Sequence, residues 1–85
     1  MLLHMRYFAS LRETLGMEAE TIELPAHIED LKELREFLAA RGPVWADAFA
    51  ADKALRAAIN QELVKASAPL QDQAEVAFFP PVTGG

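Results

Sequence analysis

Two stretches near the start of the chain alternate between apolar and polar positions. In LLHMRYF, residues 2–8, Leu3, Met5 and Tyr7 are apolar, and the positions between them are His and Arg. AETIEL, residues 19–24, alternates again and contains Thr and Ile, which favour strands. A period of two is typical of a strand with one buried face. We therefore expect two strands, paired with each other as a hairpin.

The segment between these stretches favours a short helix. Ser10 and Glu13 have the spacing of a capping box, in which each side chain bonds a free backbone N–H of the first turn. Gly16 can end this helix because glycine readily adopts the left-handed conformation of a helix C-cap.

The pattern changes after residue 25 from a period of two to apolar positions three and four residues apart. These positions are Ile28, Leu31, Leu34, Phe37 and Leu38. This spacing predicts an amphipathic helix, the longest of the chain, that ends at Gly42-Pro43. A further short helix is expected after it, with Trp45 and Phe49 one turn apart on a common face.

The last third of the chain favours strands. Residues 54–59 and 62–64 are expected to form two strands, with Asn60 and Gln61 as a tight turn between them. A polar loop follows, and EVAFF at residues 75–79 predicts the last strand.

This order of elements predicts the fold class. Eighty-five residues make one domain with one core. A hairpin, a long helix and a late strand beside the first one predict an α+β fold of the β-grasp type, with a mixed sheet packed on one long helix. The order would also fit a ferredoxin-like sandwich. We expect residues 1–79 to form the domain and residues 80–85 an extended, flexible tail.

Charge and cysteine content narrow the classes of function. The chain has 8 lysines and arginines against 13 aspartates and glutamates, a formal net charge of −5. Its cations are scattered, so we expect no nucleic-acid partner, and an acidic surface would suit a protein partner with a basic patch. The absence of cysteine excludes disulfides and thiolate catalysis and favours a reducing cytoplasm. The apolar runs are shorter than the roughly 18 residues of a membrane span, so we expect no membrane partner.

The final residues, PPVTGG, differ from the rest of this glycine-poor chain. Pro80 and Pro81 lack a backbone N–H, so the last strand must stop before them, and they hold the chain extended. Six residues in this conformation reach about 18 Å. Gly84 and Gly85 have no Cβ and can pass through a narrow channel. The end of the chain is therefore shaped for delivery into the active site of another protein.

A carboxylate delivered in this way must first be activated, because its oxygen is a poor leaving group. An acyl-adenylate is reactive, and a sulfur nucleophile would convert it to a thiocarboxylate. Since the chain has no cysteine to carry a persulfide, the C-terminal acyl group is the plausible point of attachment.

Three stretches resemble one known family. EVAFFPPVTGG at residues 75–85, INQELV at 59–64 and YFASLRETLG at 7–16 resemble the small, sulfur-carrying subunit of molybdopterin synthase. The resemblance covers nearly the whole chain and implies a ubiquitin-like β-grasp fold. Within it, QDQAEV at residues 71–76 lacks the glycine that the family usually has in this turn.

The resemblance implies a reaction in which this chain is a carrier without catalytic activity of its own. It binds no cofactor; an adenylating partner enzyme uses ATP to activate Gly85, and a sulfur donor then forms the thiocarboxylate. The tail next enters the large subunit of the heterotetrameric synthase, which supplies the catalytic pocket. There the sulfur moves to cyclic pyranopterin monophosphate, and two transfers build the dithiolene that holds molybdenum. Gly84 would let the end pass through the channel.

The resemblance also implies partner-binding residues next to the tail. Phe8 and Phe79 would supply exposed apolar surface, if the first and last strands are neighbours, and Arg12 would supply a polar contact. The tail residues expected to touch the partners are Pro80, Pro81, Val82 and Thr83. Phe8 could instead be a strand-end residue packed under the short helix.

Other functions remain open at this point. A sulfur carrier for thiamine synthesis or tRNA thiolation, a ubiquitin-like protein modifier and a β-grasp binding module share the fold. His4 and His27 are far apart and lack the spacing of metal ligands, so we expect no metal site.

Overall fold

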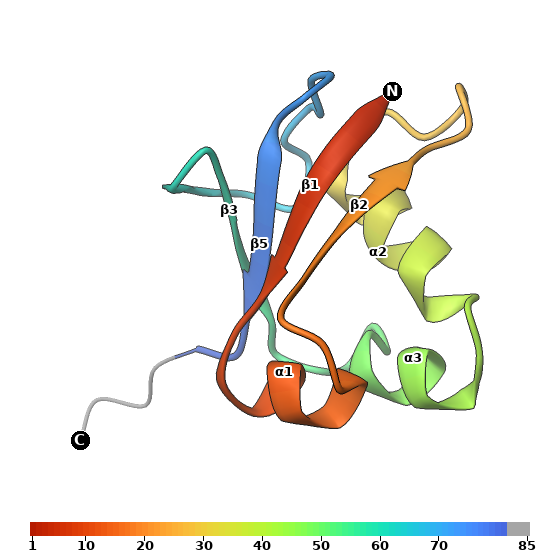
Figure 1. Ribbon diagram of the computed structural model, residues 1–85, viewed down its shortest axis with the longest axis vertical. Helices are drawn as coiled ribbons and strands as arrows, with labels where there is room; N and C mark the ends of the chain where they lie inside the picture. Colours follow the sequence, from red (N-terminus) through yellow and green to blue (C-terminus); the bar gives the residue numbers. More distant parts are fainter. Residues whose placement is uncertain (82–85) are drawn as a thin grey trace.

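The computed structural model describes residues 1–81. In chain order its elements are β1 (Leu2–Tyr7), α1 (Ala9–Leu15), β2 (Ala19–Glu23), α2 (Leu31–Ala39), α3 (Pro43–Ala48), β3 (Arg56–Ile59), β4 (Glu62–Val64) and β5 (Glu75–Phe79). Figure 1 shows the strands as one twisted sheet, with α2 across one face and α1 and α3 at its lower end. The predicted order of strands and helices is confirmed.

The sheet has the strand order β2-β1-β5-β3-β4. β1 pairs with β2 as an antiparallel hairpin and with β5 in parallel, with Tyr7 opposite Phe78. β3 pairs antiparallel with both β5 and β4. The last strand therefore lies in the centre of the sheet beside the first strand. This is the mixed sheet of a β-grasp fold, as predicted.

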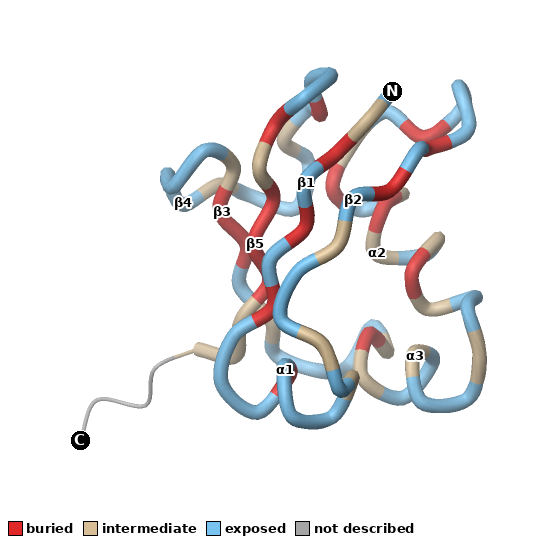
Figure 2. The backbone as a smooth tube through the Cα atoms, viewed as in Figure 1, coloured by how far each residue is buried: buried red, intermediate tan, exposed pale blue. Residues whose placement is uncertain are grey.

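Alternation along the strands places one set of side chains against α2, the inner face, and the other set on the outer face. Leu3, Met5 and Tyr7 are buried on β1, whereas the residues between them are exposed (Figure 2). The inner side chains form one core with those of α2 and Phe49, whose ring stacks on Trp45 at a centroid distance of 5.8 Å. Burying side chains of this size contributes about 1.5–3 kcal/mol each.

The main helix begins later than its apolar pattern predicts. Ile28 is buried but precedes the helix, which begins at Leu31 and has 9 residues. The reason is a cap: Asp30 Oδ1 accepts a hydrogen bond from the N–H of Glu33 at 2.8 Å. The Glu33 side chain in turn accepts one from the N–H of Glu29 at 2.9 Å. The single long helix of the prediction is therefore a helix of moderate length that shares the core with α3.

The predicted cap of α1 is wrong. The helix begins at Ala9 with no side-chain cap, so Ser10 lies inside the first turn. β1 ends at Tyr7, and Phe8, whose backbone is extended, takes the N-cap position in place of Ser10. The N–H of Phe8 bonds the carbonyl of Phe78 at 3.4 Å. The predicted end is confirmed: Gly16 has φ of 72° and donates its N–H to the carbonyl of Arg12 at 2.9 Å.

Candidate functional site

The end of β5 is the centre of the candidate site. β5 ends at Phe79, directly before Pro80 and Pro81, because neither proline can donate to the sheet. Both prolines are half-buried: Pro80 borders a crevice of about 190 Å³ beside α1, and Pro81 borders a larger groove. The chain is therefore still held against the domain at the two residues that were predicted to begin the tail.

Phe8 and Phe79 lie on either side of this end. Phe8 directly follows Tyr7, which pairs with Phe78, so Phe8 lies next to Phe79 in the sheet. Phe8 is 40% exposed, and Phe79 is half-buried. The first and last strands are therefore neighbours in the sheet, as predicted. The role of both rings in partner binding stays a prediction.

Arg12 extends the surface formed by Phe8 and Phe79. It belongs to α1, which packs beside β5. Its side chain is 51% exposed, and its closest carboxylate is Glu18, 3.9 Å away. An exposed pair at this distance contributes little stability and leaves the guanidinium available. Its predicted contact with a partner also stays a prediction.

An apolar strip crosses the outer face of the sheet from β4 to β5. Leu63 pairs with Ala58, and Ala58 pairs with Ala77, so these three side chains share one row. Leu63 is 66% exposed, the most exposed large apolar side chain of residues 1–81. The sequence analysis missed Leu63. The signal was available in the hairpin of residues 56–64, whose two-residue turn fixes which side chains share a face.

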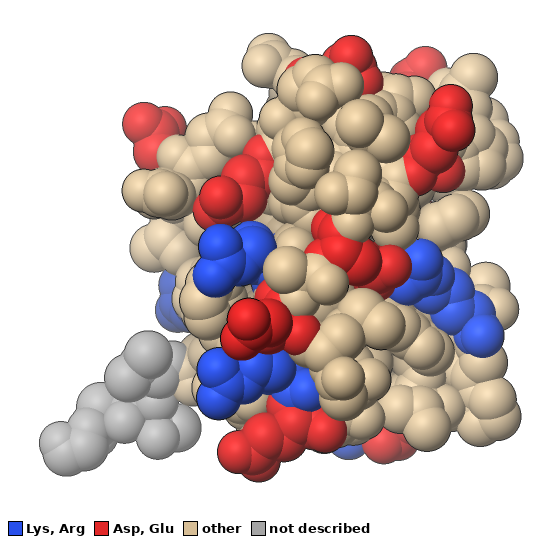
Figure 3. Space-filling view, viewed as in Figure 1, with Lys and Arg blue, Asp and Glu red and all other residues tan. Residues whose placement is uncertain are grey.

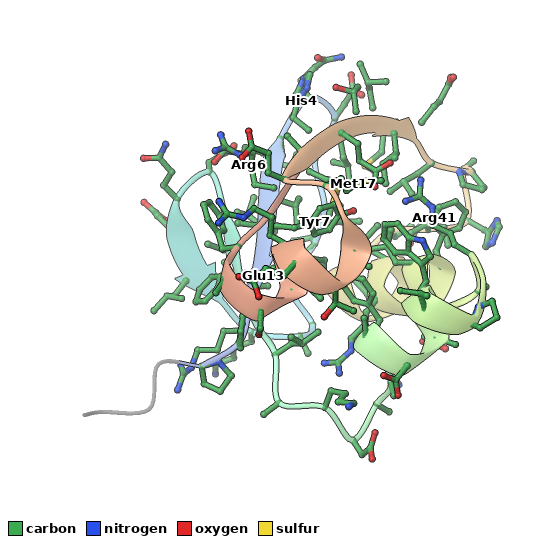
Figure 4. The ribbon with its side chains drawn as sticks, turned by 60° about the horizontal axis from the view of Figure 1, so that its bottom comes forward. His4, Arg6, Tyr7, Glu13, Met17 and Arg41 are labelled. Carbon is green, nitrogen blue, oxygen red and sulfur yellow. The ribbon has the colours of Figure 1, made fainter. Side chains whose placement is uncertain are left out.

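A partly buried polar cluster supports the inner side of the same end of β1. The hydroxyl of Tyr7 donates to Glu20 Oε2 at 2.8 Å, and Arg41 donates to both Glu20 oxygens at 2.6 and 3.0 Å. The guanidinium of Arg41 also lies over the Trp45 ring, 4.6 Å from its centroid. Figure 4 shows Tyr7 on the same side of β1 as Arg41. Arg6, which precedes Tyr7 in the chain, lies on the opposite side of this strand.

The charges of this cluster shift its pKa values. Burial, reinforced by the bond to Glu20, raises the pKa of Tyr7, which stays a neutral donor. Burial alone would raise the pKa of Glu20, but the hydrogen bonds from Arg41 and Tyr7 outweigh it and hold the pKa below its usual value. The bond to Glu20 raises the pKa of Arg41. The cluster joins β1, β2 and the segment after α2, and so fixes the strand that carries Phe8.

The large groove does not resemble a hydrolytic active site. It has a volume of about 930 Å³ and lies between α2, residues 49–57 and the β3–β4 hairpin. Its lining is mainly alanine and leucine, and Glu36 is its single carboxylate among the described residues. Arg35, which also lines it, is engaged with the backbone carbonyls of Phe49, Ala50 and Lys53. Acid–base chemistry with paired carboxylates has no support here.

Residues 1–81 contain no group of three potential metal ligands. His4 instead contacts Thr21 and Gln73 side chains, each at 3.3 Å. No helix of these residues is long and apolar enough to cross a membrane. The predicted site residues Val82, Thr83, Gly84 and Gly85 lie outside the described residues.

Comparison with known proteins identifies related chains. Residues 5–85 match the ThiS family. A relative from Escherichia coli named molybdopterin synthase sulfur carrier subunit is 47% identical over 79 residues, 93% of this chain and 94% of its own length. A relative of the same name from Haemophilus influenzae is 40% identical over 84 residues, 99% of this chain and 100% of its own length.

A solved structure agrees with these sequence matches. It is a protein–protein complex of subunits 1 and 2 of the molybdopterin-converting factor from Helicobacter pylori. The matching chain has a TM-score of 0.66 and 27% sequence identity, with 100% of each chain covered.

Proposed function

The chain belongs to the ThiS family, and we propose that it is the sulfur-carrier subunit of molybdopterin synthase. The family resemblance seen in the sequence is confirmed by the match over residues 5–85. The observation that carries the proposal is that two relatives with this name are 40% and 47% identical over nearly their full lengths.

The reaction we propose begins at Gly85. An activating enzyme transfers AMP from ATP to the C-terminal carboxylate and releases pyrophosphate. A sulfur donor then displaces AMP and leaves a thiocarboxylate. We place these steps in the cytoplasm, where ATP is available. Gly84, which has no Cβ, lets the end of the chain enter the narrow active sites of the partners.

In the second half of the reaction, the thiocarboxylate donates its sulfur to cyclic pyranopterin monophosphate in a pocket of the large subunit. The complex of subunits 1 and 2 from Helicobacter pylori supports a large-subunit partner. The position of β5 supports this geometry as well. Phe79 ends a central strand, and both prolines are half-buried against the domain, so the position from which the tail starts is defined by the sheet. We propose that Phe8, Phe79 and Arg12 dock on the partners around it.

Intact-mass measurement of the full chain, made together with its activating enzyme and sulfur donor, tests the proposal. We expect a fraction of the chain to gain the mass difference between sulfur and oxygen. When this fraction is mixed with the large subunit and cyclic pyranopterin monophosphate, the extra mass should be lost as the dithiolene product appears. A chain without Gly85 should do neither, although it should unfold at the same temperature.

The same measurement separates the other functions. A covalent adduct on lysines of other proteins would identify a modifier. Loading with sulfur but no transfer to the pterin would identify a carrier for another pathway. An unchanged mass under all these conditions would contradict the proposal.

A further inference from the structure

The outer face of the sheet separates its charges along the strands. The register of β1, β3 and β5 places Arg6 beside Ala77 and Arg56 beside Phe79, on either side of β5 and close to its end. The carboxylates of this face, Glu23 and Glu75, lie toward the other end, opposite Leu2 and His4. Figure 3 shows Asp and Glu at the top of the view, whereas Lys and Arg begin at mid-height and lie there and below together with further Asp and Glu.

The two arginines are available for an external partner. Both are exposed, and neither forms a salt bridge within residues 1–81. Arg6 lies over the ring of Phe8, 5.5 Å from its centroid, which holds its guanidinium beside the candidate docking surface. Ordinary strand spacings put the Cα atoms of Arg6 and Arg56 about 12 Å apart, with Ala77 and Phe79 between them.

The carboxylates near this end of β5 belong to other partners or other elements. Glu18 faces Arg12 at 3.9 Å, and Glu13 belongs to the exposed side of α1 and not to the sheet. The outer face therefore presents a small apolar surface between two guanidinium groups that have no salt-bridge partner among residues 1–81. The chain as a whole has a net charge of −5. The net charge predicts a basic partner, but the local charge at the site has the opposite sign.

Building on the proposed function, we propose that Arg6 and Arg56 each bind a carboxylate of the large subunit. The two arginines lie on either side of β5, whose Phe79 contacts an apolar surface of that subunit. The partner surface then has an apolar centre and an acidic border. An arginine can bond a carboxylate through two parallel N–H groups, which fixes orientation as well as proximity. Charge complementarity at a border mainly accelerates association and selects the partner, whereas the apolar centre supplies most of the affinity.

Binding of the full chain to the large subunit of the same organism, measured at low and high salt, tests this inference. The variant Arg6→Glu/Arg56→Glu is compared with Lys32→Glu/Lys65→Glu, which makes the same change in net charge at exposed positions outside this face. We expect the arginine variant to lose roughly tenfold or more in affinity at low salt, chiefly in the association rate, and the lysine variant to lose much less. High salt should narrow the difference because it screens exposed charges. Arg6→Gln/Arg56→Gln should lie between.

Two results would overturn the inference. Equal losses in the arginine and lysine variants would show that only net charge matters. A loss in the arginine variant that does not change with salt would show that the side chains act by packing. In both cases the unaltered chain still binds, so the proposed function stands. If the unaltered chain does not bind the large subunit at all, both proposals fail.

Discussion

At the scale of single residues, the turn before β5 contains a backbone conformation that its side chain does not favour. Gln73 has φ of 69°, in the left-handed region where glycine is preferred. The turn is held by the N–H of Gln73, which donates to the carbonyl of Leu2 at 2.7 Å, and by Asp72, which accepts the N–H of Leu2 at 2.7 Å. The missing glycine noticed in the sequence therefore corresponds to a real requirement for positive φ.

We expect Gln73→Gly to stabilise the protein by about 0.5–1 kcal/mol, because relief of the left-handed strain exceeds the entropy that glycine adds to the unfolded chain. Urea denaturation would measure the change. Gln71→Gly, at a neighbouring position without positive φ, should be destabilising and serves as the control. Equal effects at both positions would show that the turn is not strained.

Glu20 contributes to the response of this protein to acid. Because its pKa is lower in the folded than in the unfolded state, its charge stabilises the fold above the unfolded value of about 4.3. This stabilisation is lost as the pH falls through the folded pKa. Glu20→Gln keeps an acceptor for Tyr7 but loses the charge, so we expect a loss of about 1–2 kcal/mol at neutral pH.

Thermal denaturation between about pH 7 and pH 3 checks this expectation. The difference between the Gln variant and the unaltered chain should shrink toward zero at the acid end. A difference that stays constant over the range would mean that Glu20 acts by shape alone. Glu62→Gln, which makes the same substitution at an exposed position of β4, is the control.

At the scale of the elements, the period of the apolar pattern predicts type and order well and predicts boundaries poorly. The alternation in β1 and β2 is visible because one face of these strands is buried. Asn60 and Gln61 take the positive φ values of a tight turn, as expected. The start of α2 differs, because an apolar residue such as Ile28 can be buried in a turn as well as in a helix. Asp30 with Glu33 was the decisive signal, since the cap, not the apolar periodicity, fixes where the helix begins.

Asp30→Ala should therefore destabilise the protein by about 1 kcal/mol, because the N–H of Glu33 loses its acceptor. Chemical denaturation would measure this loss, and Asp30→Ser, which restores an acceptor, should recover most of it. If serine and alanine are equally destabilising, the charge of Asp30 or its place beside Pro69 matters more than the cap.

At the scale of the whole molecule, the site depends on pairings that no local pattern contains. The bonds from Tyr7 and Arg41 to Glu20 span 13 and 21 residues of the sequence. The row from Leu63 to Ala77 and the positions of Arg6 and Arg56 follow from the register of four strands. Phe8 and Phe79 could be selected from the sequence because they border the prolines and the first helix. Leu63 could have been placed on a face from its hairpin alone, but the arginine pair could not, because its placement needs the pairing of β5 with both β1 and β3.

Phe79→Asp should weaken binding to the large subunit by roughly tenfold to a hundredfold, because the apolar burial of a phenylalanine is lost and a carboxylate is placed near the acidic border that we propose for the partner. Calorimetric titration would measure this effect. Val44→Asp, at a position 51% exposed on α3, makes the same chemical change at a remote site and should bind normally. Unaltered binding by the Phe79 variant would place the docking surface elsewhere.

The central position of β5 has a consequence for newly made protein. The β1–β2 and β3–β4 hairpins do not pair with each other. β5 lies between them and pairs with β1 on one side and β3 on the other. During translation, the sheet stays in two halves until the ribosome has released the residues just before the prolines. A nascent chain, or one truncated before β5, therefore lacks the continuous sheet. In the proposed function, such a chain would present no complete surface to an activating enzyme, so folding would precede activation.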